Sequence, residues 1–235
     1  LENFKNLKPD LAIVIAYGII LPNIYLEIPK FGFINIHFSL LPKWRGASPI
    51  EHSLLNGDKE TGVTIFRLNS ELDAGPIISF KSIKIEEKIQ KRELFTELKN
   101  LGKDLLINTL PEYFDNNLDT ISQDSKNLSY AKKITTEDRK IDFYSDVKKI
   151  NNKIRAFSPK PGAWFLLGGE RIKIIECNYG FKKSIPSTII NEKFHLGCKD
   201  GHIEPIIIQK EGKKAMLISN FIKGFRFNIG QKIND

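Results

Sequence analysis

The chain has 235 residues, of which 41% are hydrophobic and 27% are charged, and it contains two cysteines. This composition is typical of a globular protein, and it excludes a disordered or fibrous chain and a scaffold held by disulfides. The longest apolar run, residues 11–22, is too short and too interrupted to span a bilayer, and no export signal opens the chain. We therefore expect a cytoplasmic protein, monomeric and without a membrane partner.

The charge is distributed unevenly along the chain. There are 36 Lys and Arg side chains against 28 Asp and Glu, which gives a net charge of +8. Residues 1–125 carry 14 basic and 17 acidic side chains, a net −3, whereas residues 126–235 carry 22 and 11, a net +11. The asymmetry indicates two domains, the second with a polyanionic partner, although a solvated lysine-rich surface explains it equally well.

Apolar runs in the first half predict an α/β layer architecture. Residues 11–16 form a continuous apolar run, which is typical of a strand buried on both faces in a parallel sheet. Further strands are predicted at 31–36, 62–68 and 77–85, with a short helix at 48–56.

A helix and a polar connector follow these strands. Leu94, Leu98, Leu101 and Leu105 recur at helical spacing, on a helix that we expect to end near Pro111. The stretch up to residue 138 is polar and rich in turn-forming residues, so we interpret it as a connector.

The second half begins with a helix and continues as β structure. A helix is predicted over 147–157, with Ser145 placed to cap it. Apolar runs at 163–167 and 170–176 flank Gly168-Gly169, which is a hairpin signal. Short strands around 186–198 and 203–209 complete the pattern of a small barrel or sandwich.

Polar residues at the end of one predicted strand are candidates for catalysis. Asn35 and His37 lie at alternate positions and point to the same side of that strand. An imidazole can exchange protons near neutral pH and an amide can stabilise an oxyanion, although a hydrogen-bonded structural histidine fits the spacing as well. Asp73, before Gly75 in a later loop, is either a turn residue or a carboxylate that raises the pKa of His37.

Other stretches carry weaker signals. The sequence lacks the glycine-rich fingerprints of nucleotide-binding loops. Cys177, His195, Cys198 and His202 have the residue types of zinc ligands but not a usual spacing, so we expect no metal site. Lysines around Gly212 form either an exposed hairpin turn or an edge that contacts phosphates.

Taken in order, the motifs resemble those of the folate-dependent formyltransferases. The core of the resemblance is Asn35-Ile-His37, Ser39-Leu-Leu-Pro42, Trp44-Arg-Gly-Ala-Ser-Pro-Ile50, Thr61-Gly-Val-Thr-Ile65 and Leu72-Asp-Ala-Gly75. The second half is similar to the methionyl-tRNA formyltransferase branch, through Tyr130-Ala-Lys-Lys-Ile134, Ile141-Asp-Phe143, Ile154-Arg-Ala-Phe157, Pro161-Gly-Ala-Trp164 and the stretch Gln209 to Met216. Phe38 departs from the family pattern and is expected to narrow the site.

The resemblance implies a partial Rossmann-like catalytic domain over 1–115, a linker over 116–138 and a small OB-like β-barrel domain over 139–235. Because Leu1 is the first residue and Met216 the single methionine, we also expect upstream sequence, without which the fragment is expected to be inactive alone. The family's catalytic set falls on Asn35, His37 and Asp73. Folate contacts are expected from Ala16, Tyr17, Gly18, Ile19, Leu21, Ser39, Leu40, Leu41, Pro42, Leu72 and Gly75, and acceptor contacts from Arg45, Gly46, Lys210, Lys213 and Lys214.

The implied reaction is transfer of a formyl group from 10-formyltetrahydrofolate to the amino group of methionyl-initiator-tRNA, without a metal. His37 is expected to be protonated through its pairing with Asp73. Two rival hypotheses remain: a formyltransferase acting on an amino-sugar nucleotide, and a non-catalytic RNA-binding protein built on the same scaffold.

Overall fold

The structure is a computed structural model that describes residues 1–15, 17–18, 21–115 and 117–233. It divides into two compact units. The first comprises Leu1–Ser53, Asp58–Glu86 and Glu93–Lys133, and the second comprises Leu54–Gly57, Glu87–Arg92 and Ile134–Asp235. Within the described ranges, no helix has both the length and the apolar character needed to cross a membrane.

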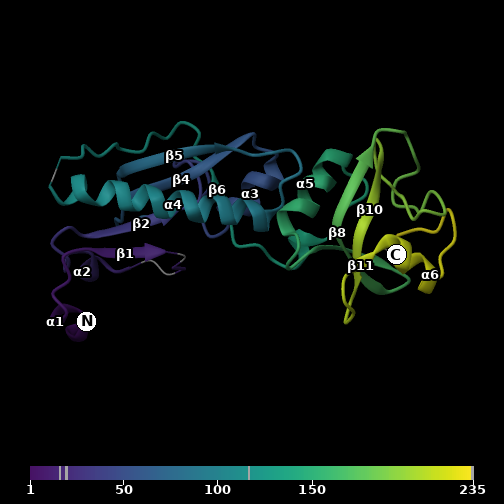
Figure 1. Cartoon of the computed structure of the whole chain (residues 1–235), viewed down its shortest axis with the longest axis horizontal. Helices are drawn as coiled ribbons and strands as arrows, with labels where there is room; N and C mark the ends of the chain where they lie inside the picture. Colours follow the sequence, from purple (N-terminus) through teal and green to yellow (C-terminus); the bar gives the residue numbers. More distant parts are fainter. Residues whose placement is uncertain (16, 19–20, 116, 234–235) are drawn as a thin grey trace. The chain divides into compact units, whose positions relative to one another are not determined.

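A four-stranded mixed sheet forms the centre of the first unit. Its strands are β1 (Ala12–Ile15), β2 (Phe33–His37), β4 (Glu60–Arg67) and β5 (Ile77–Lys84), in the order β1-β2-β4-β5 (Figure 1). β1 and β2 are parallel, whereas the other two pairs are antiparallel. All four strands match predicted ones.

The environment of β1 differs from the prediction. Its Ile13 and Ile15 side chains are 42% and 57% exposed, so the strand is not buried on both faces. β1 lies at the edge of the described sheet and pairs with β2 alone. An apolar run does not distinguish a central strand from an edge strand, and within this chain the predicted burial of β1 on both faces is not observed.

Helix α4 (Lys91–Phe114) packs along the sheet (Figure 1). A Cβ on Gly102 would lie 3.2 Å from Ile36 of β2 and 3.5 Å from Val63 of β4, so the glycine permits a close approach. The helix ends at Phe114, three residues past Pro111, which confirms the predicted end near this proline. The unit also contains the short helices α1 (Glu2–Asn6) and α2 (Asn23–Leu26) and the start of α3 (Pro49–Asn56).

Much of the predicted connector belongs to the first unit. β6 (Tyr130–Ala131) pairs in parallel with β3 (Arg45–Gly46), and Ile121 forms a bridge with Ile77 of β5. After the segment Glu87–Arg92, the chain returns to the second unit at Ile134. Residues of the predicted connector therefore lie against β3 and β5 instead of forming a free linker.

The second unit contains a five-stranded antiparallel sheet. Strands β7 (Ala163–Leu167), β8 (Glu170–Gly180), β10 (His202–Lys210) and β11 (Met216–Leu217) follow the order β11-β10-β8-β7, and β9 (Leu196–Gly197) pairs with β10. The predicted hairpin is confirmed: Gly168 and Gly169 have φ angles of 58° and 78° in the turn between β7 and β8. The described pairings leave the sheet open, so the predicted closed barrel is not confirmed.

The core of the second unit is aromatic and aliphatic. Phe143, Phe157, Phe165 and Phe194 are fully buried against helix α5 (Val147–Phe157) and the sheet. The backbone N–H of Val147, the first of α5, donates to Asp200 at 2.7 Å, whereas Ser145 bonds to Asp142. The predicted cap by Ser145 was therefore wrong, since Asp200, which is distant in the sequence, accepts the hydrogen bond from the first N–H of the helix. The unit also contains the 3-10 helix η1 (Glu137–Arg139) and helix α6 (Ile218–Gly224).

Candidate active site

The end of β2 opens into a cavity of about 560 Å³ in the first unit. Asn35 and His37 both line it, as their alternation along the strand predicts. Apolar side chains form much of the wall, including Val14, Leu21, Leu68 and Leu72. Such a cavity, apolar with a few polar groups directed into it, is the usual form of a small-molecule site.

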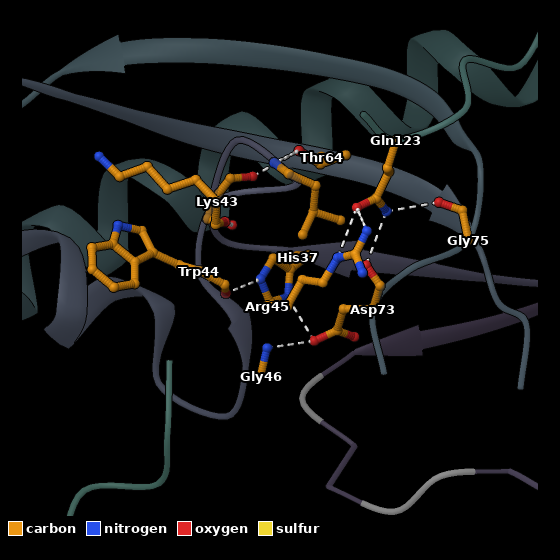
Figure 2. Close-up of polar contacts among 11 residues, drawn as sticks. His37, Lys43, Trp44, Arg45, Gly46, Thr64, Asp73, Gly75 and Gln123 are labelled. Atoms are coloured by element: carbon orange, nitrogen blue, oxygen red, sulfur yellow. Dashed lines mark hydrogen bonds and ion pairs between the residues drawn. The ribbon is translucent and has the colours of Figure 1, made fainter. Parts of the chain in front are cut away.

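His37 is held by a hydrogen bond at one ring nitrogen and lies near a carboxylate at the other. Nε2 lies 2.8 Å from the backbone oxygen of Trp44, so it carries the proton and donates it to that carbonyl. Nδ1 lies 3.8 Å from Oδ2 of Asp73, beyond hydrogen-bond distance. Figure 2 shows the imidazole between these two oxygen atoms. Nδ1 is thus the free, basic nitrogen of the ring.

The imidazole is neutral at neutral pH. Burial lowers the pKa of His37 from 6.5, and this outweighs the raising effects of the Asp73 charge and the Trp44 carbonyl. The side chain is 6% exposed, which accounts for the strength of the desolvation. The expectation of an imidazolium stabilised by Asp73 was therefore wrong, because sequence reasoning weighed the ion pair without the burial.

Asp73 is fixed by the backbone of the neighbouring loop. Its Oδ2 accepts a hydrogen bond of 2.7 Å from the N–H of Gly46 (Figure 2). Its backbone has a positive φ of 47°, a conformation that Asp tolerates better than most residues. The carboxylate therefore lies beside His37 without a strong ion pair to it.

Gln123 is a residue of the site that the sequence analysis missed. Its Oε1 accepts hydrogen bonds of 3.0 Å and 2.6 Å from Nε and Nη2 of Arg45, and its amide nitrogen donates to the backbone oxygens of Asp73 at 2.9 Å and Gly75 at 2.7 Å. Figure 2 shows the side chain between the two loops. Its polar surroundings in sequence gave no signal that separates it from a loop residue.

The loop after β2 is held in place by contacts with Asp58. Trp44 has a φ of 64°, and its indole N–H donates to Asp58 at 2.8 Å. Lys43 pairs with the same carboxylate at 2.8 Å. These contacts hold the loop in the conformation that presents the Trp44 carbonyl to His37.

The predicted folate contacts divide into two groups. Tyr17, Gly18, Leu21 and Leu72 line the cavity. Ser39, Leu40, Leu41 and Pro42 do not line it among the described residues; the N–H of Leu41 instead donates to Thr64 at 3.1 Å, and Thr64 donates to the oxygen of Ser39 at 2.7 Å. Gly75 contributes its carbonyl to Gln123, and Ala16 and Ile19 lie outside the described residues.

The predicted acceptor contacts also fall in two places. Arg45 and Gly46 line the cavity, together with Lys132 and Lys133, which sequence reasoning did not assign to the site. Lys213 and Lys214 are exposed after β10 in the second unit. Lys210, at the end of β10, pairs with Glu170 at 2.6 Å.

One polar atom of the site has no partner. Oδ1 of Asn35 is buried and makes no hydrogen bond within the described part of the chain. A buried amide that is incompletely paired is costly, and it is characteristic of a group reserved for a ligand. Asn35 therefore has a hydrogen-bond acceptor, Oδ1, available at the cavity.

Comparison with known proteins gives the family. Residues 1–110 match the formyl transferase domain, and residues 133–226 match the formyl transferase C-terminal domain. Methionyl-tRNA formyltransferase from Wolbachia sp. subsp. Drosophila simulans is 40% identical over 98% of this chain and 75% of that protein. The enzyme of the same name from Dictyoglomus thermophilum is 41% identical, over 97% of this chain and 76% of its own. The chain belongs to the methionyl-tRNA formyltransferase family.

Solved structures agree with the membership of this family. HypX from Aquifex aeolicus, in complex with tetrahydrofolic acid, matches with a TM-score of 0.72 over 97% of this chain and 43% of its own, at 19% identity, which shows the fold alone. The N-formyltransferase from Helicobacter canadensis, in complex with folinic acid and dTDP-3-aminofucose, matches with a TM-score of 0.62 at 25% identity, over 75% of this chain and 65% of its own. The chain thus has formyltransferase N-terminal and C-terminal domains with mixed α/β sheets.

Proposed function

We propose that this protein transfers a formyl group from 10-formyltetrahydrofolate to the amino group of methionyl-initiator-tRNA. The observation that carries the proposal is the convergence of Asn35, His37 and Asp73 at one cavity, in a chain about 40% identical to methionyl-tRNA formyltransferases. This substrate places the activity in the cytoplasm, where translation is initiated, and a monomer suffices for it because all three residues come from one chain.

The cavity suits a flat heterocyclic donor. Its apolar wall provides faces for stacking, and Asn35 retains unsatisfied bonding capacity. Tyr17, Gly18, Leu21 and Leu72 would contact the folate, while Ser39 to Pro42 and Gly75 hold the surrounding loops. When bound, the folate supplies the activated one-carbon group.

The proton chemistry follows from the state of His37. Its neutral Nδ1 accepts the proton that the methionyl amine loses as its nitrogen bonds to the formyl carbon, since Nε2–H is committed to the Trp44 carbonyl. The same ring can return that proton to the donor nitrogen as the bond between this nitrogen and the formyl carbon breaks. The Asp73 carboxylate, 3.8 Å away, then stabilises the imidazolium. The amide of Asn35 donates to the formyl oxygen as negative charge develops there, an interaction worth about 2.7–4 kcal/mol in enzymes that use such a donor.

The second unit would bind the tRNA. Residues 134–235 carry 19 Lys and Arg against 11 Asp and Glu, a net charge of +8, and Lys213 and Lys214 are exposed there. The finer fold assignments also belong to the proposal: a Rossmann-like first unit and an OB-like barrel. They rest on the family resemblance.

The test is single-turnover formylation by the full-length protein, with charged initiator tRNA and a dTDP-amino sugar as alternative acceptors. We expect formylation of the tRNA alone. Asn35→Ala should lower the rate about 10²–10³-fold, and His37→Ala and Asp73→Asn should also lower it strongly. Asn220→Ala, at an exposed position of α6, is the matched control and should leave the rate unchanged.

Three outcomes would contradict the proposal. Formylation of the sugar nucleotide in preference to tRNA would assign the other acceptor. Tight tRNA binding without turnover of the folate would indicate a non-catalytic protein. Near-normal rates in His37→Ala and Asp73→Asn would show that neither side chain is catalytic.

A further inference from the structure

Two histidines and a glutamate meet in the second unit, away from the cavity. His195 immediately precedes β9, whereas His202 and Glu204 lie on β10. β9 and β10 pair with His202 opposite Gly197 and Ile203 opposite Leu196. The same register, continued by one residue, sets His195 opposite Glu204, and the alternation along β10 puts His202 on the same face.

The three side chains direct their ligand atoms toward one another. Oε1 of Glu204 lies 3.0 Å from Nε2 of His202 and 3.9 Å from Nδ1 of His195. The two imidazole rings are stacked, with centroids 5.5 Å apart and planes inclined by 10°. All three ligand atoms lie within 4.8 Å of one another. One carboxylate oxygen therefore faces both imidazole nitrogens.

A second set of contacts orients the buried ring of His202. Its Nδ1 lies 3.3 Å from the backbone oxygen of Lys182, to which it donates. In metal-binding histidines the ring nitrogen that does not bind the metal usually donates to a carbonyl in this way. Nε2, on the other side of the ring, hydrogen-bonds to Oε1 of Glu204 at 3.0 Å. Gly180 makes room for the ring, because a Cβ there would lie 2.6 Å from Cε1 of His202.

The cluster offers nitrogen and oxygen ligands and, among the described residues, no sulfur. Burial raises the pKa of Cys177 and Cys198 to about 12. Both thiols stay protonated, and only the thiolate is an effective metal ligand.

We propose that Nδ1 of His195, Nε2 of His202 and the carboxylate of Glu204 bind a divalent transition-metal ion, with Zn²⁺ as the best match. Two imidazoles and one carboxylate, with a position left for water, are a known zinc ligand set. Tetrahedral ligands at bonds of 2.0–2.1 Å are about 3.4 Å apart, so His195 has only to move about 1 Å. The ion would tie the segment before β9 to β10 within the second unit.

The test is titration of the full-length protein with zinc chloride by calorimetry, with melting temperature as a second readout. We expect one ion per chain and a higher melting temperature with zinc. His195→Ala, His202→Ala and Glu204→Gln should each weaken binding at least about tenfold and abolish the zinc-dependent rise. His52→Ala removes a histidine of the first unit and should bind as the unaltered protein does.

Folding of each variant is checked by circular dichroism without zinc, and Glu204→Gln keeps the shape of the side chain if an alanine variant fails to fold. The proposal is overturned if the unaltered protein binds no zinc, or if the three variants bind it equally well. Loss of binding in Cys198→Ser together with normal binding in the histidine variants would overturn it too, since it would assign a thiolate site.

Discussion

The carboxamide oxygen of Gln123 accepts two hydrogen bonds from the guanidinium of Arg45, at 3.0 Å and 2.6 Å. Through its amide nitrogen the same side chain donates to the carbonyl oxygens on either side of Ala74. Gln123 therefore joins the strand that carries Arg45 and Gly46 to the loop that carries Asp73. The relative position of Asp73 and Gly46 depends on this one residue as well as on their own hydrogen bond.

Replacing Gln123 by alanine should impair formylation more than folding. Four hydrogen bonds are lost, and the Asp73 loop is free to move relative to His37. A displacement of about 1 Å near reacting groups can lower the rate about 10²-fold. We therefore expect kcat/KM of Gln123→Ala to fall by at least about tenfold. The free energy of unfolding should fall by about 1–3 kcal/mol, as measured by urea denaturation.

Two further variants separate positioning from general damage. Gln123→Glu keeps the acceptor for Arg45 but loses the donor to the Asp73 loop, so it should rescue the stability more than the rate. Gln231→Ala, which removes a glutamine that accepts from the N–H of Asn228 in the second unit, should change neither. Equal rates in Gln123→Ala and the unaltered protein would show that the loop holds its position without the amide.

The sequence predicted the strands of the first unit and the central site residues, because periodicity and the position of polar residues after β2 are local signals. It did not identify three residues of the site, Gln123, Lys132 and Lys133. They join the site through the pairing of β6 with β3, which links Tyr130 to Arg45 across a long sequence separation. No local pattern distinguishes such a segment from a solvated connector. The Ser145 cap failed for the same reason, and the closed barrel, which the described pairings do not confirm, also depends on contacts between distant segments.

The state of His37 predicts the pH dependence of the reaction. Burial lowers its pKa from 6.5, and the proposed base is the neutral ring. The single-turnover rate should therefore rise with pH through an apparent pKa below 6.5 and stay level above it. The free energy of unfolding should follow the same direction. Between the lowered pKa of His37 in the folded protein and its value of 6.5 in the unfolded chain, the unfolded chain binds more protons. The free energy of unfolding should therefore decrease as the pH falls below about 6.5.

Asp73→Asn tests the electrostatic part of this account. The Asp73 charge raises the pKa of His37, so its removal should move the acidic limb of the rate profile to still lower pH while reducing the plateau. His37→Ala should abolish the limb altogether. A limb that persists unchanged in His37→Ala would belong to another group and would remove His37 as the base.

Gly46 has to remain glycine for steric reasons. Its φ is 118°, and a Cβ would lie 2.7 Å from the carbonyl oxygen of Ala131. Gly46→Ala should therefore separate β3 from β6 and displace the N–H that binds Asp73, lowering the free energy of unfolding by about 1–3 kcal/mol. Trp44 in the first unit and Trp164 in the second report the two units separately by fluorescence.

The matched control is Gly224→Ala in α6. A Cβ there meets no atom within 4 Å, so the substitution should be neutral or mildly stabilising. If Gly46→Ala is as stable as Gly224→Ala, β3 and β6 adapt more easily than the geometry of the Ala131 carbonyl implies.

The lysines after β10 predict the salt dependence of tRNA binding. Lys213 and Lys214 are exposed, so they are available to phosphates, whereas Lys210 is paired with Glu170 at 2.6 Å and lies 5.7 Å from the ring of Phe225. Each phosphate contact that is lost reduces the slope of log K against log salt by about one. Lys213→Ala and Lys214→Ala should therefore flatten the slope, and Lys210→Ala should flatten it less because Glu170 already neutralises its charge. Lys103→Ala, beside Asp104 at 3.3 Å in the first unit, is the control. Identical slopes for all four variants and the unaltered protein would place the tRNA elsewhere on the basic surface.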